Sequence, residues 1–299
     1  MKAIIIQDIE KSFPLKKGKV QALSNISFEV PKGELFGLIG PDGAGKTTLF
    51  RILTTLMLPD KGQAEVNGLD VIKDFKQIRK EIGYMPGRFS LYTDLTVEEN
   101  LNFFANIFNT SVKENYSLIK DIYQQIEPFK HFRAGKLSGG MKQKLALSCA
   151  LIHRPKILFL DEPTTGVDAV SRKEFWELLK SLKAQGITIL VSTPYMDEAS
   201  LCDRVSLIQN GKIMKVDTPA NLSNNFGKKM LAVKGAGMIK TLELFHKMEG
   251  VEDVYSFGEE YHVVLKENVG KLEMPEGIES REITADIEDV FISLMNKHV

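Results

Sequence analysis

The chain has 299 residues, 43% of them hydrophobic and 26% charged, which suits one large globular domain and one small one. Its formal net charge is zero, which argues against a nucleic-acid-binding protein because bulk electrostatics favours no polyanion. The two cysteines, Cys149 and Cys202, lack metal-ligand spacing, and their small number is typical of a reducing compartment. Cys149 lies in an apolar helical stretch, so we expect it in the core.

No segment has the length and apolar composition of a membrane span. The run Ile4–Ile6 is cut off by Asp8 and Glu10, whereas a spanning helix needs about 20 apolar residues. We therefore expect a cytoplasmic protein. A role in transport would require docking onto the membrane helices of another chain.

The early part of the chain predicts two kinds of β-structure. Three short apolar segments indicate an antiparallel sheet: Ile4–Ile9, Val20–Leu23 and Ile26–Val30. Glu34–Ile39 is typical of a buried strand, and it leads through a glycine-rich turn into a helix expected at 45–58.

Further along, strands and helices alternate, which predicts an α/β core with a mostly parallel sheet. Ile157–Leu160 and Ile187–Val191 are continuous apolar runs typical of buried strands. A helix between them is indicated by apolar residues at helical spacing: Phe175, Leu178, Leu179 and Leu182. Residues 88–152 show helical patterns alone, which predicts a helical subdomain inserted into this core.

The sequence pattern changes after Val216, which predicts one domain at 1–216 and a small α+β domain at 217–299. A polar, glycine-punctuated segment, 217–229, comes first. The expected elements are Met230–Val233 (strand), Ile239–Met248 (helix), Val251–Ser256 and Tyr261–Leu265 (strands), a short strand near Ile283 and a helix near Ile287–Leu294. This order fits a split βαβ sandwich.

A complete G-x-x-x-x-G-K-[ST] motif follows the strand that ends at Ile39. Its residues are Gly40, Pro41, Asp42, Gly43, Ala44, Gly45, Lys46, Thr47 and Thr48. Glycines allow the backbone amides to curl around phosphate oxygens, and the helix that follows directs its positive end at them. We expect Lys46 to bind the β- and γ-phosphates and Thr47 to bind Mg²⁺. A chance glycine-rich turn is the alternative, but the strand before and the helix after favour ATP.

Two acids end the apolar run at Ile157–Leu160. We expect Asp161 to hold Mg²⁺ and Glu162 to orient or deprotonate the attacking water. Solvated acids at a strand end are the alternative, and the upstream phosphate loop favours the catalytic interpretation.

Leu137–Lys144 contains a serine and two glycines, Ser138, Gly139 and Gly140, at the start of a helix. The helix carries Met141, Leu145, Cys149 and Ile152 on one face. Such a start presents free amides and a hydroxyl to an anion. An ordinary N-capped helix is the alternative.

With these motifs, residues 1–216 resemble the ATP-binding cassette family. The resemblance implies a P-loop NTPase core with the predicted subdomains, a signature motif at Leu137–Gln143 that closes on ATP in an opposing subunit, and a partner-touching loop at Thr164–Asp168. It places Phe13 where an aromatic ring stacks on adenine; a core side chain is the alternative. The run Phe89–Leu101 resembles multidrug and antibiotic exporter subunits, and residues 217–299 resemble their small C-terminal domain.

The resemblance further implies ATP and Mg²⁺ as cofactors, separate membrane-spanning permease subunits as partners, and a peripheral position on the inner face of the cell membrane. It also implies ATP hydrolysis that drives export.

Two positions depart from the family pattern: Gly87 stands where the family has a glutamine, and Pro194 where it has a histidine. Neither can make the hydrogen bonds near the γ-phosphate that the resemblance implies. The nearest glutamines on either side, Gln77 and Gln124, lie outside that loop, and no histidine lies near position 194; the five are His131, His153, His246, His262 and His298.

We therefore expect this chain's own ATP site to hydrolyse weakly, and we expect a heterodimer with a second cassette subunit. A homodimer with two weak sites is the competing arrangement. Other classes are a regulatory cassette without turnover, a cassette ATPase of translation or DNA repair, and a P-loop kinase. The last two fit less well, because the chain lacks a second cassette and a kinase has no use for Leu137–Gln143.

Overall fold

The computed structural model describes residues 1–235, 238–267, 269, 272, 274–275 and 277–297; His298 lies outside them. The chain divides into two compact units, Met1–Asp217 and Thr218–Val299. Among the described residues no helix has the length and apolar character needed to cross a bilayer.

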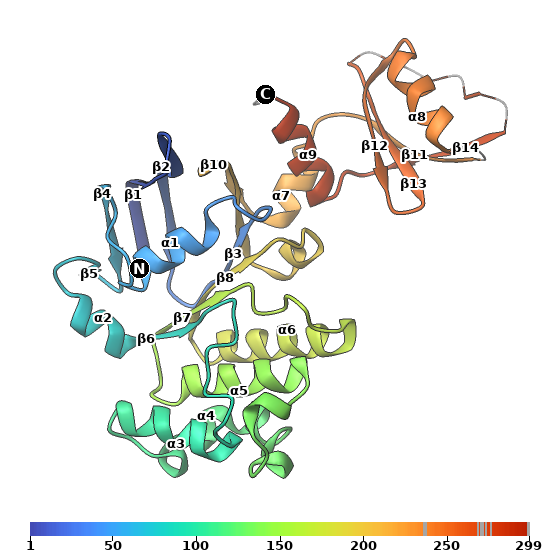
Figure 1. Cartoon of the computed structure of the whole chain (residues 1–299). Coiled ribbons are helices and arrows are strands. Elements are labelled where there is room, and N and C mark those ends of the chain that lie inside the picture. Colours follow the sequence, from blue (N-terminus) through green and yellow to red (C-terminus); the bar gives the residue numbers. More distant parts are fainter. Residues whose placement is uncertain (236–237, 268, 270–271, 273, 276, 298–299) are drawn as a thin grey trace. The chain divides into compact units, whose positions relative to one another are not determined.

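A six-stranded sheet forms the centre of the first unit, in the order β10-β9-β3-β8-β7-β6 (Figure 1). Its strands are β3 (Leu35–Ile39), β6 (Ile82–Met85), β7 (Ile157–Asp161), β8 (Thr188–Thr193), β9 (Arg204–Gln209) and β10 (Lys212–Asp217). All neighbours pair in parallel except β9 and β10. The predicted buried strands are confirmed as β3, β7 and β8, each buried along its length. Sequence reasoning missed β6, β9 and β10.

The helix after the phosphate motif, α1 (Lys46–Leu53), is shorter than predicted. The prediction of a helix reaching position 58 is wrong because Thr55 adopts a left-handed conformation, φ 63°. Two hydrogen bonds then close the end of the helix, Leu56 N–H to the Arg51 carbonyl (2.7 Å) and Thr55 N–H to the Ile52 carbonyl (3.0 Å). This pair of bonds is the Schellman arrangement, here without the usual glycine.

A four-stranded antiparallel sheet flanks the core in the order β2-β1-β4-β5. Its strands are β1 (Lys2–Pro14), β2 (Lys19–Pro31), β4 (Lys61–Val66) and β5 (Leu69–Asp70). The sequence predicted two strands where β2 is one, because β2 runs through an irregular register that includes Asn25 at φ 52°. Its apolar face packs with residues of α1 and the central sheet in one core cluster.

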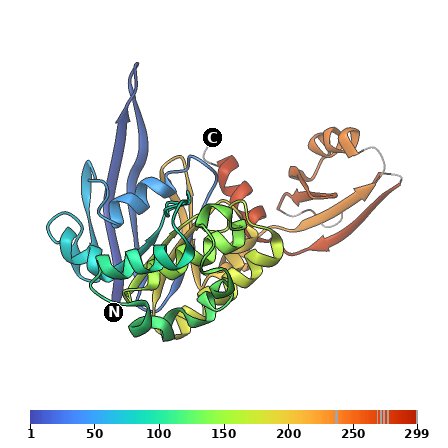
Figure 2. The ribbon, with the colours of Figure 1, turned by 60° about the horizontal axis from the view of Figure 1, so that its bottom comes forward.

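The region from 88 to 152 is helical, as predicted. It contains α3 (Val97–Ile107), α4 (Val112–Tyr123), two short 3₁₀ turns at Glu127–Phe129 and Ala134–Lys136, and α5 (Gly139–Leu151). Thr96 and Ser111 begin α3 and α4 with reciprocal capping boxes, which satisfy free amides at both helix starts. Figure 2 shows these helices and α6 (Ala169–Ala184) in front of the strands. A further short helix, α2 (Phe75–Glu81), precedes β6.

The second unit contains a four-stranded antiparallel sheet in the order β12-β13-β11-β14. Its elements are α7 (Pro219–Asn224), β11 (Met230–Gly235), α8 (Met238–Lys247), β12 (Val251–Phe257), β13 (Glu260–Leu265), β14 (Ile278–Ile283) and α9 (Ile287–Lys297). The strand order agrees with the split βαβ pattern expected from the sequence.

A buried polar cluster joins α9 to this sheet. His262 Nδ1 lies 2.6 Å from Asp289 Oδ1, and the Tyr255 hydroxyl donates to the same oxygen at 2.9 Å. The other carboxylate oxygen accepts the backbone N–H of Asp286 (2.8 Å). Burial acts to raise the pKa of Asp289, but the hydrogen bonds from His262, Asp286 and Tyr255 hold that pKa below its ordinary value. The carboxylate therefore satisfies three donors at once.

Asp289→Asn should destabilise the second unit by about 1–3 kcal/mol, because one amide oxygen cannot replace two carboxylate oxygens and a buried donor loses its partner. The measurement is the opening free energy of β13 amides by native-state hydrogen exchange. The matched control is Glu259→Gln, which removes the same charge from a side chain that is 88% exposed. Equal effects of the two substitutions would contradict the structural role of the cluster.

Candidate nucleotide-binding site

The phosphate motif forms a loop between β3 and α1 that only glycine can follow at two positions. A Cβ on Gly40 would lie 2.1 Å from the Ile208 carbonyl oxygen. Gly45, at φ 107°, precedes the first residue of α1, and a Cβ there would lie 2.6 Å from the Ala22 carbonyl oxygen. The backbone of the loop is thereby held close to β2 and β9, with the amino end of α1 beside it. This arrangement is an anion cradle.

Lys46 lies inside this loop and is 3% exposed. Its ammonium donates to the carbonyl oxygens of Gly40 (2.7 Å) and Pro41 (3.0 Å), and it forms an ion pair with Glu162 Oε1 at 3.0 Å. The cation is thus hydrogen-bonded by the loop and paired with the predicted catalytic acid. It lies where anionic oxygens in the cradle would meet it.

The two acids lie at the carboxyl end of β7. Asp161 is buried, and its Oδ1 accepts a hydrogen bond from the Ser192 hydroxyl at 2.6 Å. Glu162 has φ 50°, an unusual value for a residue with a side chain, and its N–H donates to the Ser192 carbonyl (3.0 Å). The end of β8 therefore fixes the orientation of both acids, and the backbone turn at Glu162 directs its side chain to Lys46.

Gly87 and Pro194 border the same group of side chains. A Cβ on Gly87 would lie 3.0 Å from the Asp161 carbonyl oxygen and 3.7 Å from Glu162 Cβ. Pro194 follows Thr193, whose carbonyl oxygen accepts the Gly40 N–H at 3.3 Å. The structure thus brings both unusual positions to the edge of the phosphate loop and the acidic pair.

Ser138 begins α5 as an N-cap, and its hydroxyl accepts the Met141 N–H at 3.3 Å. A Cβ on Gly139 would lie 3.4 Å from the Gly166 carbonyl, and one on Gly140 would lie 2.7 Å from the Ser171 hydroxyl. Ser138 and Gly139 are exposed. The start of α5 therefore lies against the segment that follows Glu162, with its serine open to solvent.

Phe13 lies on β1, paired with Val20 of β2, and is half-buried. Lys11 Nζ lies 5.9 Å from the centre of its ring. Ala22 and Leu23, just beyond Val20 on β2, border the phosphate loop at Gly45. Phe13 is therefore on the hairpin next to the loop, and its contact with adenine stays a prediction.

Sequence reasoning missed Ser192, which contacts Asp161, and Glu198, which lies behind the site. Ser192 directly follows the apolar run Ile189–Val191 at the end of β8, which is a local signal for a polar role. Glu198 gives no such signal, because its partners Thr164 and Thr193 lie on other segments.

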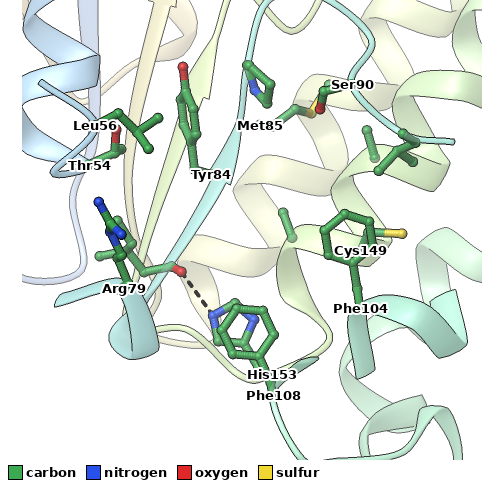
Figure 3. A pocket seen from close by; sticks show the side chains of 15 residues that line it. Thr54, Leu56, Arg79, Tyr84, Met85, Ser90, Phe104, Phe108, Cys149 and His153 are labelled. Carbon is green, nitrogen blue, oxygen red and sulfur yellow. Dashed lines mark hydrogen bonds between the residues drawn. The ribbon is translucent and has the colours of Figure 1, made fainter. Parts of the chain in front are cut away.

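An apolar pocket of about 290 Å³ lies between the central sheet and the helical region (Figure 3). Its walls come from the end of α1, from β6 and the loop after it, and from α3 and α5; they include Leu56, Tyr84, Pro86, Phe104, Phe108 and Cys149. Cys149 is buried, as expected from the sequence, and burial raises the pKa of its thiol strongly. Because Met85, Pro86, Ser90 and Leu91 also line it, the pocket adjoins the loop that carries Gly87.

His153 closes one side of this pocket (Figure 3). Its Nε2 lies 2.9 Å from the Ile82 carbonyl, and its ring stacks on Phe108 with centroids 3.7 Å apart. Burial lowers the pKa of His153, against the opposing effect of the hydrogen bond with Ile82. The imidazole therefore stays neutral at pH values where a free histidine is protonated.

Stability should fall as the pH is lowered from 7 to 5.5, because the unfolded chain gains a proton at His153 below about pH 6.5 while the folded chain resists it. His153→Gln keeps a donor for the Ile82 carbonyl but cannot titrate, so it should flatten this decline in calorimetric Tm. His131→Gln is the control, since His131 is 75% exposed. An unchanged slope in His153→Gln would contradict the assignment.

The residues present fit a magnesium–nucleotide complex. The cradle excludes side chains at Gly40 and Gly45, and the donor set near it consists of hard oxygens, the Thr47 hydroxyl and the Asp161 carboxylate, which suit Mg²⁺. Fold and site together define a P-loop nucleotide-binding protein.

Comparison with known proteins identifies the family. A family model described as ABC transporter matches residues 23–165. The chain is 38% identical to the probable multidrug ABC transporter ATP-binding protein YbhF of Escherichia coli, over 98% of this chain and 52% of that protein. It is 33% identical to Nod factor export ATP-binding protein I of Burkholderia lata, over 99% and 98% of the two chains. A solved dimeric bacterial ABC transporter cassette matches with a TM-score of 0.66 and 25% identity, over 72% and 98%.

The chain belongs to the ABC transporter family. It spans about half the length of the Escherichia coli relative.

Proposed function

We propose that the chain is the ATP-binding subunit of an ABC exporter and that it couples ATP binding and hydrolysis to separate membrane-spanning subunits. The observation that carries this proposal is the meeting of Lys46, Asp161 and Glu162 at one edge of the sheet. Relatives that match almost the whole chain are named for multidrug transport and Nod factor export, which supports export.

In this proposal the loop from Gly40 to Thr48 binds the phosphates of ATP. Its backbone amides and the Lys46 ammonium neutralise the phosphate oxygens, and Phe13 stacks on the adenine. Thr47 and Asp161 hold Mg²⁺, which would neutralise charge on the transferred phosphoryl group. Glu162 lies 3.0 Å from Lys46 and accepts a proton from, or orients, the attacking water.

The exposed serine-capped start of α5 binds the ATP of a second cassette subunit. Ser138 and Gly139 are open to solvent, so their hydroxyl and amide can reach an anion outside this chain. The dimeric cassette to which the chain is similar supports such an assembly. We favour a heterodimer, in which a partner cassette with the usual glutamine and histidine supplies the site that turns over.

The chain's own site is proposed to bind ATP and hydrolyse it slowly. Gly87 has no side chain next to Asp161 and Glu162, and Pro194 cannot donate a hydrogen bond. Loss of one such transition-state hydrogen bond costs about 2.7–4 kcal/mol, or about 10²–10³ in rate. A regulatory cassette with almost no turnover is the second candidate function, favoured by the same two positions.

Gly87→Gln together with Pro194→His should raise the ATPase kcat of the purified chain by about 10²-fold or more, because both side chains reach the γ-phosphate region. A Cβ at position 87 fits only if the Asp161 carbonyl moves away by a few tenths of an ångström. Gly87→Ala therefore measures this steric cost alone. Steady-state phosphate release is the measurement. Full turnover by the unmodified chain alone would contradict the weak-site proposal.

The apolar pocket beside the Gly87 loop is proposed to receive a cytoplasmic segment of the membrane subunit. It lies between the sheet and the helical region. Pro86 lines it and belongs to the loop that carries Gly87, next to the acidic pair. A segment seated there would therefore be in mechanical contact with the ATP site.

Leu56→Asp should abolish co-purification with the membrane subunit. It places a charge in the pocket wall, and that charge would have to lose its water when the membrane subunit docks. The control is Leu58→Asp; both leucines are exposed, at 57% and 62%, and Leu58 is absent from the pocket wall. The two variants should have the same Tm and the same affinity for ATP. Retention of the membrane subunit by Leu56→Asp would disprove docking at this pocket.

A further inference from the structure

Glu198 is a buried carboxylate behind the ATP site, on the 3₁₀ turn Asp197–Leu201 after β8. Its side chain joins two separate segments. The Thr193 hydroxyl donates to Glu198 Oε2 at 2.5 Å, and the Thr164 hydroxyl donates to the same oxygen at 3.1 Å. Thr193 ends β8, and Thr164 lies in the loop after Glu162.

Each threonine is in turn bonded to a functional loop. The Thr193 carbonyl accepts the Gly40 N–H at 3.3 Å, which ties it to the phosphate loop. The Thr164 carbonyl accepts the Val167 N–H at 3.2 Å, which shapes the segment Thr164–Asp168 that leads to α6. A path therefore runs from Gly40 to that segment, made of hydrogen bonds that are joined through the two threonines and Glu198.

The burial of Glu198 needs an explanation in its own right. The residue is 2% exposed, and among the described residues its second oxygen, Oε1, has no hydrogen-bond partner. A half-satisfied buried carboxylate is costly, and apolar or amide side chains would fill the same space at lower cost. A glutamate is accounted for at this position if its role is to hold the two threonine hydroxyls on one oxygen.

We propose that Glu198 is a positioning residue that transmits the state of the phosphate loop to the segment Thr164–Asp168. The inference rests on the proposed ATP-binding function and adds to it a route between the bound phosphates and the surface that faces a partner cassette. When phosphate binds to the loop, the position of the Gly40 amide changes. Thr193 is hydrogen-bonded to that amide and to Glu198, so Glu198 moves as well. Glu198 in turn displaces Thr164 and the partner-facing segment.

The test compares ATP affinity with the ATP-induced change in hydrogen exchange at residues 164–168, both in the full chain. In the unmodified protein MgATP should alter exchange of the Thr165 and Val167 amides. Glu198→Ala should leave the Kd for ATP within about threefold and reduce the change in exchange by about tenfold, since two hydrogen bonds to a charged group are lost. General destabilisation would instead alter exchange with and without ATP alike.

Thr164→Val and Thr193→Val each remove one hydroxyl without changing shape. Each should act like Glu198→Ala, and Thr164→Val should add nothing in a Glu198→Ala background, because both remove the same link. The matched control is Thr188→Val, a buried threonine at the other end of β8, about 17 Å away, whose hydroxyl accepts the Gly33 N–H. Glu198→Gln, which keeps an acceptor for both hydroxyls, should restore part of the coupling.

If Glu198→Ala binds ATP and shows the same ATP-induced change in hydrogen exchange as the unmodified chain, the role of Glu198 is overturned. The proposed function would remain intact. Additive effects of Thr164→Val and Glu198→Ala would overturn the hydrogen-bonded route. Failure of the unmodified chain to bind MgATP would overturn the proposed function, and with it this inference; the direct measurement of Kd separates that outcome from the others.

Discussion

The parallel pairing of β3, β8 and β7 is the constraint on which the rest of this structure depends. Its register places Ile39 opposite Thr193 and Ser192 opposite Asp161, so three buried strands end at one edge. The phosphate loop leaves β3, the acids leave β7, and the residues that orient them belong to β8. The three strands are buried along their length, so the polar groups at this edge are positioned by the sheet and by contacts such as that of the Ser192 hydroxyl with Asp161.

Lys46 shows how this edge manages a buried charge. A lysine ammonium removed from water is costly unless it is paired, and here two loop carbonyls and Glu162 supply its partners. Phosphate oxygens would compete for the same ammonium. Binding of a nucleotide is therefore linked directly to the freedom of Glu162, the acid expected to act on water.

The two unusual positions, Gly87 and Pro194, lie next to the same group of side chains. Gly87 lies next to the Asp161 carbonyl and the Glu162 Cβ, and Pro194 follows the residue whose carbonyl accepts the Gly40 N–H. Two separate points of the chain thus border the group formed by Lys46, Asp161 and Glu162. The apolar pocket next to the Gly87 loop lies between the sheet and the helical region.

By itself, the sequence determined the α/β class, the phosphate loop, the acidic pair and the capped start of α5, because each is a local pattern: a buried apolar run, a glycine-dependent turn or a capping residue. Local patterns could not reveal β6, β9 and β10, whose short or mixed sequences become strands through pairing with neighbours, nor the early end of α1, where Thr55 takes a conformation usually left to glycine. The tertiary structure alone placed Ser192 on Asp161 and Glu198 between Thr164 and Thr193. Ser192 and Asp161 are 31 positions apart, and Thr164 and Glu198 are 34 apart, so only the pairing of the folded sheet brings them within hydrogen-bonding distance.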